Sequence, residues 1–274
     1  MKFKKGYSLV AVTLLFASCT AIVDKAPLGP VLAASQVKIQ VVQKTAGANA
    51  VTLLNATKGV VIYFDWGTGA GKSASLDDSV NFYVPFKGTF KLKYTAFCAG
   101  GTVLDSTTYT IASNDNAYFD TDPAWKGLTA GGAGQTWVWA LDVPGKVVAG
   151  NGPLNCTAPA WWNVNTDPGN NAMLDFNASV YCDLNGGANF VQTKGDGSVV
   201  KGFFNVLAPF TDPGDDSPVK PYSAIQVSGG AGFPWPNGNG VSKYHITKMT
   251  PDVLSVHDYN GYNVGMYKRK GFKY

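Results

Sequence analysis

The chain has 274 residues with a formal net charge of +4, and hydrophobic residues make up 45% of it. Three lysines lie in an N-terminal segment that we expect to be removed, so the mature protein should be nearly neutral. A near-neutral surface excludes the basic footprint that nucleic-acid binding needs. The length suits two domains.

The N-terminus has the pattern of a secretory signal peptide. Lys2, Lys4 and Lys5 precede an apolar run over residues 9–16, and small residues follow it. A basic flank, a short apolar core and small residues are typical of such a peptide. The run is also too short to cross a bilayer as a mature helix. We expect residues 1–18 to be the signal peptide.

The end of this segment, Leu15-Phe16-Ala17-Ser18-Cys19, resembles a bacterial lipobox. The resemblance implies that Cys19 becomes the lipidated first residue, with an accidental cysteine as the alternative. Lipid chains would hold the protein at a membrane while the rest stays in water. Residues 19–36 are small, polar and proline-bearing, as in a flexible tether. We expect an outer-membrane lipoprotein exposed on the cell surface.

Composition favours an all-β protein. The chain contains no glutamate, although helix-rich proteins use it freely. Its apolar runs are short and are interrupted by Gly, Pro, Asn and Asp, which is typical of β-sandwiches. The missing glutamates also remove the commonest catalytic carboxylate.

In the first half, polar and apolar residues alternate over 36–41, and further strands are predicted over 60–65, 82–96 and 108–111. Residues 64–69, Phe-Asp-Trp-Gly-Thr-Gly, and the aromatic and glycine spacing over 85–92 resemble a polycystic-kidney-disease-type (PKD) domain. The likeness covers residues 37–113 and departs at Thr68, where that family usually has Asp. It implies a small immunoglobulin-like sandwich that acts as a spacer.

The second domain is predicted over residues 114–274. Asp122 and Pro123 offer an N-cap and a first-turn proline, which predicts a short helix. A strand is expected over 136–141, and turn residues separate the further strands at sandwich-like spacing. These are predicted at 172–181, 188–191, 199–206, 242–248, 253–256 and 262–268. We expect a larger, jelly-roll-like β-sandwich.

This half resembles the C-terminal module of secreted lipoproteins from Bacteroidota-type bacteria. The likeness is carried by residues 128–132, 136–139 and 244–254 and by the pair Trp161-Trp162. It implies a glycan-associated module beside polysaccharide-uptake proteins of the outer membrane.

Six of the seven tryptophans lie in this second domain. Large aromatic side chains are most often core residues, although their rings can also stack on the flat C–H faces of sugars. Trp137 and Trp139 are two apart in a predicted strand and therefore share a face. We expect both to be buried, and Trp125 to be structural.

The remaining tryptophans give the candidate ligand site. Trp161 and Trp162 are adjacent, so their rings should point to opposite sides of an extended chain, and one of them can reach solvent. Trp235 lies in a loop between two prolines, which stiffen it. Asn237 and Asn239 follow as candidate partners for sugar hydroxyls. Alternatively, the loop packs Trp235 into the core of its own domain.

The predicted function is therefore capture of a polysaccharide by aromatic platforms, without a cofactor or bound metal. A structural or adhesive surface protein is one alternative, and a polysaccharide-degrading enzyme is another. We expect no hydrolase, because no Ser/His/Asp or Cys/His pattern is apparent. Residues 212–216 could hold calcium but read more simply as a turn. Whether Cys156 and Cys182 form a disulfide is open.

Overall fold

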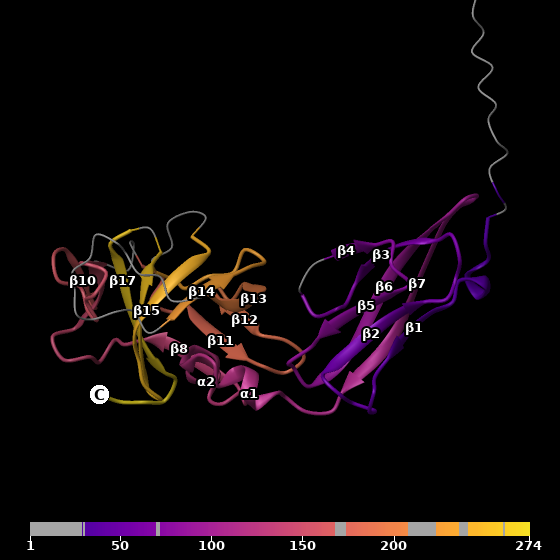
Figure 1. Cartoon of the computed structure of the whole chain (residues 1–274). Coiled ribbons are helices and arrows are strands. Elements are labelled where there is room, and N and C mark those ends of the chain that lie inside the picture. The colour runs from indigo at the N-terminus through magenta and orange to yellow at the C-terminus, as the bar shows by residue number, and fades with distance from the viewer. Residues whose placement is uncertain are drawn as a thin grey trace, which may run out of the picture.

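The computed structural model describes residue 29 and residues 31–69, 72–167, 174–207, 223–235, 241–259 and 261–274. The expectations for Cys19, for residues 212–216, and for Asn237 and Asn239 therefore lie outside the described residues. The described chain is all-β apart from a few short helical segments, and it forms two domains that lie side by side (Figure 1). This confirms the predicted all-β class, with a small sandwich followed by a larger β domain.

The first domain is a sandwich of two antiparallel sheets, with strand orders β1-β2-β5 and β4-β3-β6-β7. A 3-10 turn, η1 (Ala34–Gln36), precedes them. The strands are β1 (Ile39–Val42), β2 (Ala50–Asn55), β3 (Val61–Asp65), β4 (Lys72–Ser75), β5 (Ser79–Tyr83), β6 (Gly88–Cys98) and β7 (Gly101–Ile111).

Alternation explains this sandwich. Along β6, Phe90, Leu92 and Tyr94 are buried while the two lysines between them are exposed, as predicted. The run predicted as one strand over 82–96 is broken between β5 and β6, because Pro85 provides no amide hydrogen for a sheet. Both sheets bury their inner faces around a core that includes Trp66.

A short helical connection joins the domains. It consists of α1 (Asn116–Phe119) and α2 (Pro123–Thr129). The carboxylate of Asp122 accepts a hydrogen bond of 2.8 Å from the amide of Ala124, and Pro123 occupies the first turn. The predicted helix is thus confirmed. Its last turn ends at Ala130, which adopts a left-handed conformation at φ 51°.

Ten strands belong to the second domain in the part of it that the structure describes. They are β8 (Gln135–Trp139), β9 (Val147–Asn151), β10 (Asn163–Asn165), β11 (Ser179–Asp183), β12 (Asn189–Thr193), β13 (Val199–Leu207), β14 (Ser223–Val227), β15 (Lys243–Met249), β16 (Val253–Asp258) and β17 (Asn263–Arg269).

Eight of these strands close on themselves. From β11 to β17 each strand pairs with its neighbour in sequence, and β8 pairs with β11 on one side and with β17 on the other. The closure is therefore a meander rather than the Greek-key order of a jelly roll. Strand β8 pairs with the C-terminal end of β17, and β9 pairs with its N-terminal end. Strand β10 pairs with β9 and forms the edge of the sheet.

The interior of this closed sheet holds the second core. Trp137 and Trp139 are 0% and 1% exposed, and their indole N–H groups donate to the carbonyls of Leu128 and Asp175. Trp125 is buried as well. All three tryptophans expected in the core are therefore there. Among the described residues, no helix has the length and apolar character needed to span a membrane.

Candidate functional site

Three exposed aromatic side chains and one half-buried one gather near the junction of β9, β10 and β17. Strands β10 and β17 lie in the part of the second domain that is away from the first domain (Figure 1). We call Trp161, Trp162, Trp235 and Tyr262 the aromatic patch. The backbone positions of three of them are fixed by the end of β9. Asn151 accepts from the amide of Trp161 and donates to the carbonyl of Trp162, and Gly152 donates to the carbonyl of Tyr262.

A glycine permits the close approach of these segments. A side chain at Gly150 would place its Cβ 2.0 Å from the carbonyl oxygen of Trp162. Backbone can come this near only where the strand carries no side chain. Gly150 therefore sets how closely β10 and the two tryptophans before it lie against β9.

The patch contains two ring pairs. Trp161 and Tyr262 have ring centroids 5.4 Å apart, and both side chains are 61% exposed. Trp162, which is 43% exposed, lies 6.4 Å from Trp235. The adjacent tryptophans thus have different partners, as expected if their side chains point to opposite sides of an extended backbone. Both Trp161 and Trp162 are exposed, whereas the sequence predicted only that one of them can reach solvent.

Trp235 is half-buried and packs against the core of the second domain. Its backbone is tied to Tyr267 of β17: its amide donates to the tyrosine hydroxyl at 2.9 Å, and that hydroxyl donates back to its carbonyl. Its indole N–H is buried and finds no partner in the described part of the chain. The structure therefore makes Trp235 a support for Trp162 more than a freely presented ring.

Hydrogen-bonded polar side chains link the strands that carry the patch. The amide of Asn151 donates to Asn263 at 2.8 Å, and the amide of Asn263 donates to the carboxylate of Asp258 at 2.8 Å. Burial raises the pKa of Asp258. Because buried polar groups are costly when unpaired, this chain of hydrogen bonds favours a single register of β9, β16 and β17.

Sequence reasoning found Trp161 and Trp162 but missed Tyr262. A tyrosine next to a glycine turn gives only a weak signal, and nothing local predicts that it meets Trp161. Asn237 and Asn239 lie outside the described residues, so their part in the site stays a prediction.

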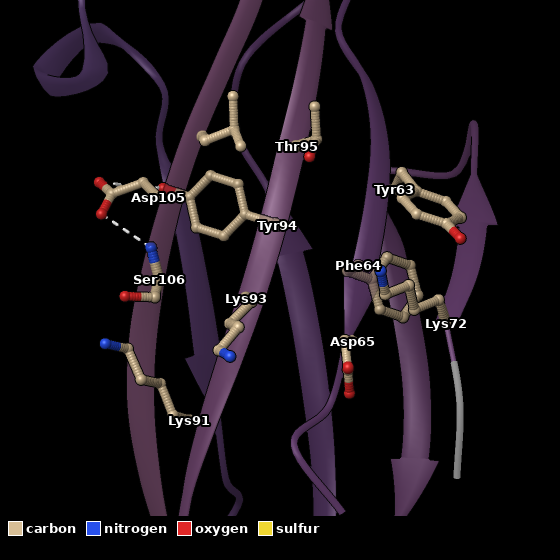
Figure 2. Close-up of a pocket in the computed structure, with 11 residues that line it drawn as sticks. Tyr63, Phe64, Asp65, Lys72, Lys91, Lys93, Tyr94, Thr95, Asp105 and Ser106 are labelled. Carbon is tan, nitrogen blue, oxygen red and sulfur yellow. Dashed lines mark hydrogen bonds between the residues drawn. The ribbon is translucent and has the colours of Figure 1, made fainter. Parts of the chain in front are cut away.

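A concave surface of about 450 Å³ lies on the four-stranded sheet of the first domain, apart from the aromatic patch (Figure 2). Lysines are its most frequent charged residue, but Asp65 lies directly across from Lys72 on β4 and from Lys93 on β6. The ammonium group of Lys72 also lies 5.9 Å from the centre of the Tyr63 ring. Since the charges are largely matched within the sheet, this surface is best explained as a solvated face.

One nucleophile-like pair that the sequence did not reveal is formed by Cys156 and His257. The imidazole Nε2 lies 3.4 Å from the Cys156 sulfur and 3.0 Å from the Cys156 carbonyl oxygen. Burial raises the pKa of the thiol and lowers the pKa of His257 to about 4. Both groups are therefore neutral near pH 7, whereas a cysteine nucleophile needs a thiolate. Cys98, Cys156 and Cys182 are all free thiols.

Comparisons with known proteins give distant likenesses only. No family model matches the chain, and no curated protein matches it. The solution structure of the PKD domain from the human VPS10 domain-containing receptor SorCS2 covers 33% of this chain and 81% of that domain, at 10% identity and a TM-score of 0.28.

A second solved structure concerns the promiscuous specificity of carbohydrate-binding modules from the β-sandwich superfamily. It covers 85% of this chain and 90% of its own, at 11% identity and a TM-score of 0.25. Likeness at this level carries no argument about what this chain binds.

Proposed function

We propose that this protein binds polysaccharide through the aromatic patch. The observation that carries the proposal is the Trp161–Tyr262 pair, in which two large rings lie together and remain mostly exposed. A single exposed ring is ordinary, whereas exposed apolar side chains that lie together in one patch point to an interaction site. Sugar rings offer flat C–H faces that fit such rings.

The geometry favours weak individual sites. If each ring is worth about 1–3 kcal/mol, by analogy with base stacking, two or three rings give dissociation constants from millimolar to micromolar. A lipid anchor at Cys19 on the outer-membrane surface, which rests on the N-terminal sequence alone, would allow many copies to engage one polymer. The first domain would then act as a spacer, and uptake proteins would receive the captured polymer.

Affinity electrophoresis tests this function. The full-length protein, in a detergent without a sugar headgroup, is run through gels that contain xylan, β-glucan, mannan or galactan. We expect at least one polysaccharide to retard the wild type, and the double variant Trp161→Ala/Tyr262→Ala to lose the retardation. Phe97→Ala removes an exposed ring, 46% accessible, from the first domain and should behave as the wild type.

Two results would contradict the proposal. One is that none of the four polysaccharides retards the wild type. The other is that the double variant, shown by thermal unfolding to be folded, is retarded as strongly as the wild type. A sustained release of reducing ends that a single aspartate substitution abolishes would instead favour the enzyme alternative.

A further inference from the structure

A separate cleft, of about 660 Å³, lies where the two domains meet, away from the aromatic patch. This volume is within the range of ligand sites, about 300–1,000 Å³. The first domain lines it with Thr68 and Gly69, which follow β3, and with the end of β5 and the segment after it. The second domain lines it mainly with its helical connection and with β13 and β14. Figure 1 shows these elements facing one another across the junction.

The junction is held by direct contacts, so the cleft exists before any ligand binds. Phe86 packs against both cores, with its ring 5.4 Å from that of Phe119. The carbonyl of Pro85 accepts from the amide of Asp115, and that of Lys87 accepts from the amide of Gly186, each at 2.9 Å. A preformed site spares a ligand the cost of ordering it.

Three exposed aromatic side chains from different elements line the cleft. Tyr83 of β5 is 45% exposed, Phe203 of β13 is 41% exposed, and Tyr118 of α1 is 38% exposed. Tyr83 is fixed in place because its hydroxyl donates to the carboxylate of Asp115. Both domains therefore contribute a ring to the same concave surface.

Two carboxamides lie beside these rings on the outside of the closed sheet. Phe203 and Asn205 are two apart on β13 and so share a face. Asn205 is the direct cross-strand partner of Gln226 on β14, and both side chains are exposed. The ring and the two amides therefore form a continuous strip across two neighbouring strands.

The chemistry of this lining limits the ligand. As far as the structure describes them, the lining residues carry no formal charge, so a charged ligand would find no counter-ion. A purely apolar ligand would leave the amides of Asn205 and Gln226 without partners. Carboxamides both donate and accept, as hydroxyl groups require, and rings stack on C–H faces.

We infer that the cleft is a second binding site and that it takes a segment of a neutral oligosaccharide. The class of ligand rests on the proposed function, whereas the place and the residues are independent of the aromatic patch. Strand β10, which directly follows Trp161 and Trp162, and strand β13, which lines the cleft, lie at opposite ends of the second domain (Figure 1). One long polymer can therefore engage both, and its second contact forms at a high effective concentration.

Equilibrium dialysis with labelled neutral hexasaccharides tests this inference. The probes are those of cellulose, xylan, mannan and amylose, applied at saturating concentration to the full-length protein in a detergent without a sugar headgroup. We expect two equivalents of at least one probe to bind per wild-type chain. Phe203→Ala and, separately, Gln226→Ala should each abolish binding of the second equivalent or raise its dissociation constant at least tenfold. Both residues are exposed, and Phe97→Ala serves as the matched control.

The variants separate this inference from the proposed function. The double variant Trp161→Ala/Tyr262→Ala should still bind one equivalent. If adding Phe203→Ala to that variant removes this equivalent, the cleft binds sugar. If Phe203→Ala and Gln226→Ala both bind as the wild type, the cleft inference is wrong and the patch is unaffected. If no probe binds the wild type, or an uncharged extended peptide displaces the sugar from the cleft, the inference is also wrong.

Discussion

Trp161 and Tyr262 come from different loops, yet their rings lie 5.4 Å apart and both remain 61% exposed. The contact depends on β9, whose end binds the backbone of both segments. Because the backbone is fixed, the rings are presented without much loss of freedom on binding. A pair built in this way can act as a stacking platform.

Trp137 should be a purely structural residue. It is fully buried, and its indole N–H donates to the Leu128 carbonyl. Trp137→Ala should lower the free energy of unfolding by about 3–5 kcal/mol, since it leaves a cavity and an unpaired carbonyl. Urea unfolding followed by circular dichroism measures the change. A loss of less than about 1 kcal/mol would contradict this role.

Trp235 should support the patch from below. Trp235→Ala removes a half-buried ring that packs on the core and on Trp162, so we expect stability to fall by about 1–3 kcal/mol. Polysaccharide binding should also weaken, because Trp162 loses its neighbour. Thermal unfolding and affinity electrophoresis measure the two effects. An unchanged melting temperature with lost binding would show that Trp235 is a contact ring instead.

His257 should make the protein less stable in acid. Its folded pKa is lowered from 6.5 to about 4, so the unfolded state takes up a proton first, and stability falls as the pH drops from about 6.5 towards 4. At 1.36 kcal/mol per pH unit, the full loss is about 3 kcal/mol. The measurement is urea unfolding at several pH values, for the wild type and His257→Gln.

The variant isolates this histidine from its neighbours. His245, the cross-strand partner of His257, also has a pKa lowered by burial and acts in the same direction. Asp258, whose pKa burial raises, acts in the opposite direction. We expect His257→Gln to show a shallower fall in stability with acid than the wild type. Parallel curves for the two proteins would refute the assignment.

Phe86 should couple the two domains. Its ring is half-buried and packs on Phe119 and Trp125 across the junction. Phe86→Ala should cost about 2 kcal/mol, less than for a fully buried phenylalanine, and should speed proteolysis near residues 112–116. Phe97→Ala is the control. Equal proteolysis rates in all three proteins would rule out this coupling.

The same contacts bear on the domain boundary. Residues 115–274 should fold alone, because the second core is made almost entirely from that segment. Because the fragment lacks Phe86, its melting temperature should be lower than that of the second domain in the intact protein.

Cys19 should carry the lipid anchor. Metabolic labelling with a fatty acid should mark the wild type and leave Cys19→Ala unlabelled, since the thiol is the site of attachment that the lipobox pattern implies. Cys98→Ala, which removes a cysteine of the first domain, should label normally. Equal labelling of the wild type and Cys19→Ala would show that the pattern is accidental.

Local patterns predicted much of the fold. Alternation over Phe90, Leu92 and Tyr94 predicted a half-buried strand, and Asp122 with Pro123 predicted a helix start. The spacing of Trp137 and Trp139 predicted a shared buried face. These inferences hold because burial period, capping and proline geometry act over a few residues and are visible in the sequence.

Weakly patterned strands escaped prediction. Strand β9 (Val147–Asn151) is almost wholly buried and contains a glycine, so it shows no alternation. Strand β14 (Ser223–Val227) is buried at four of its five positions. A short apolar run of this kind does not reveal its secondary structure by periodicity.

The candidate sites depended on long-range contacts. The sequence determined that Trp161 and Trp162 lie together near a turn and that aromatic residues are plentiful. Only the tertiary structure decided that Tyr262 joins Trp161, that Trp235 is half-buried, and that Tyr83 and Phe203 face one cleft. The physical reason is that strand pairing between distant segments is set by the packing of the whole core, whereas sequence periodicity reports only which face of each segment is buried.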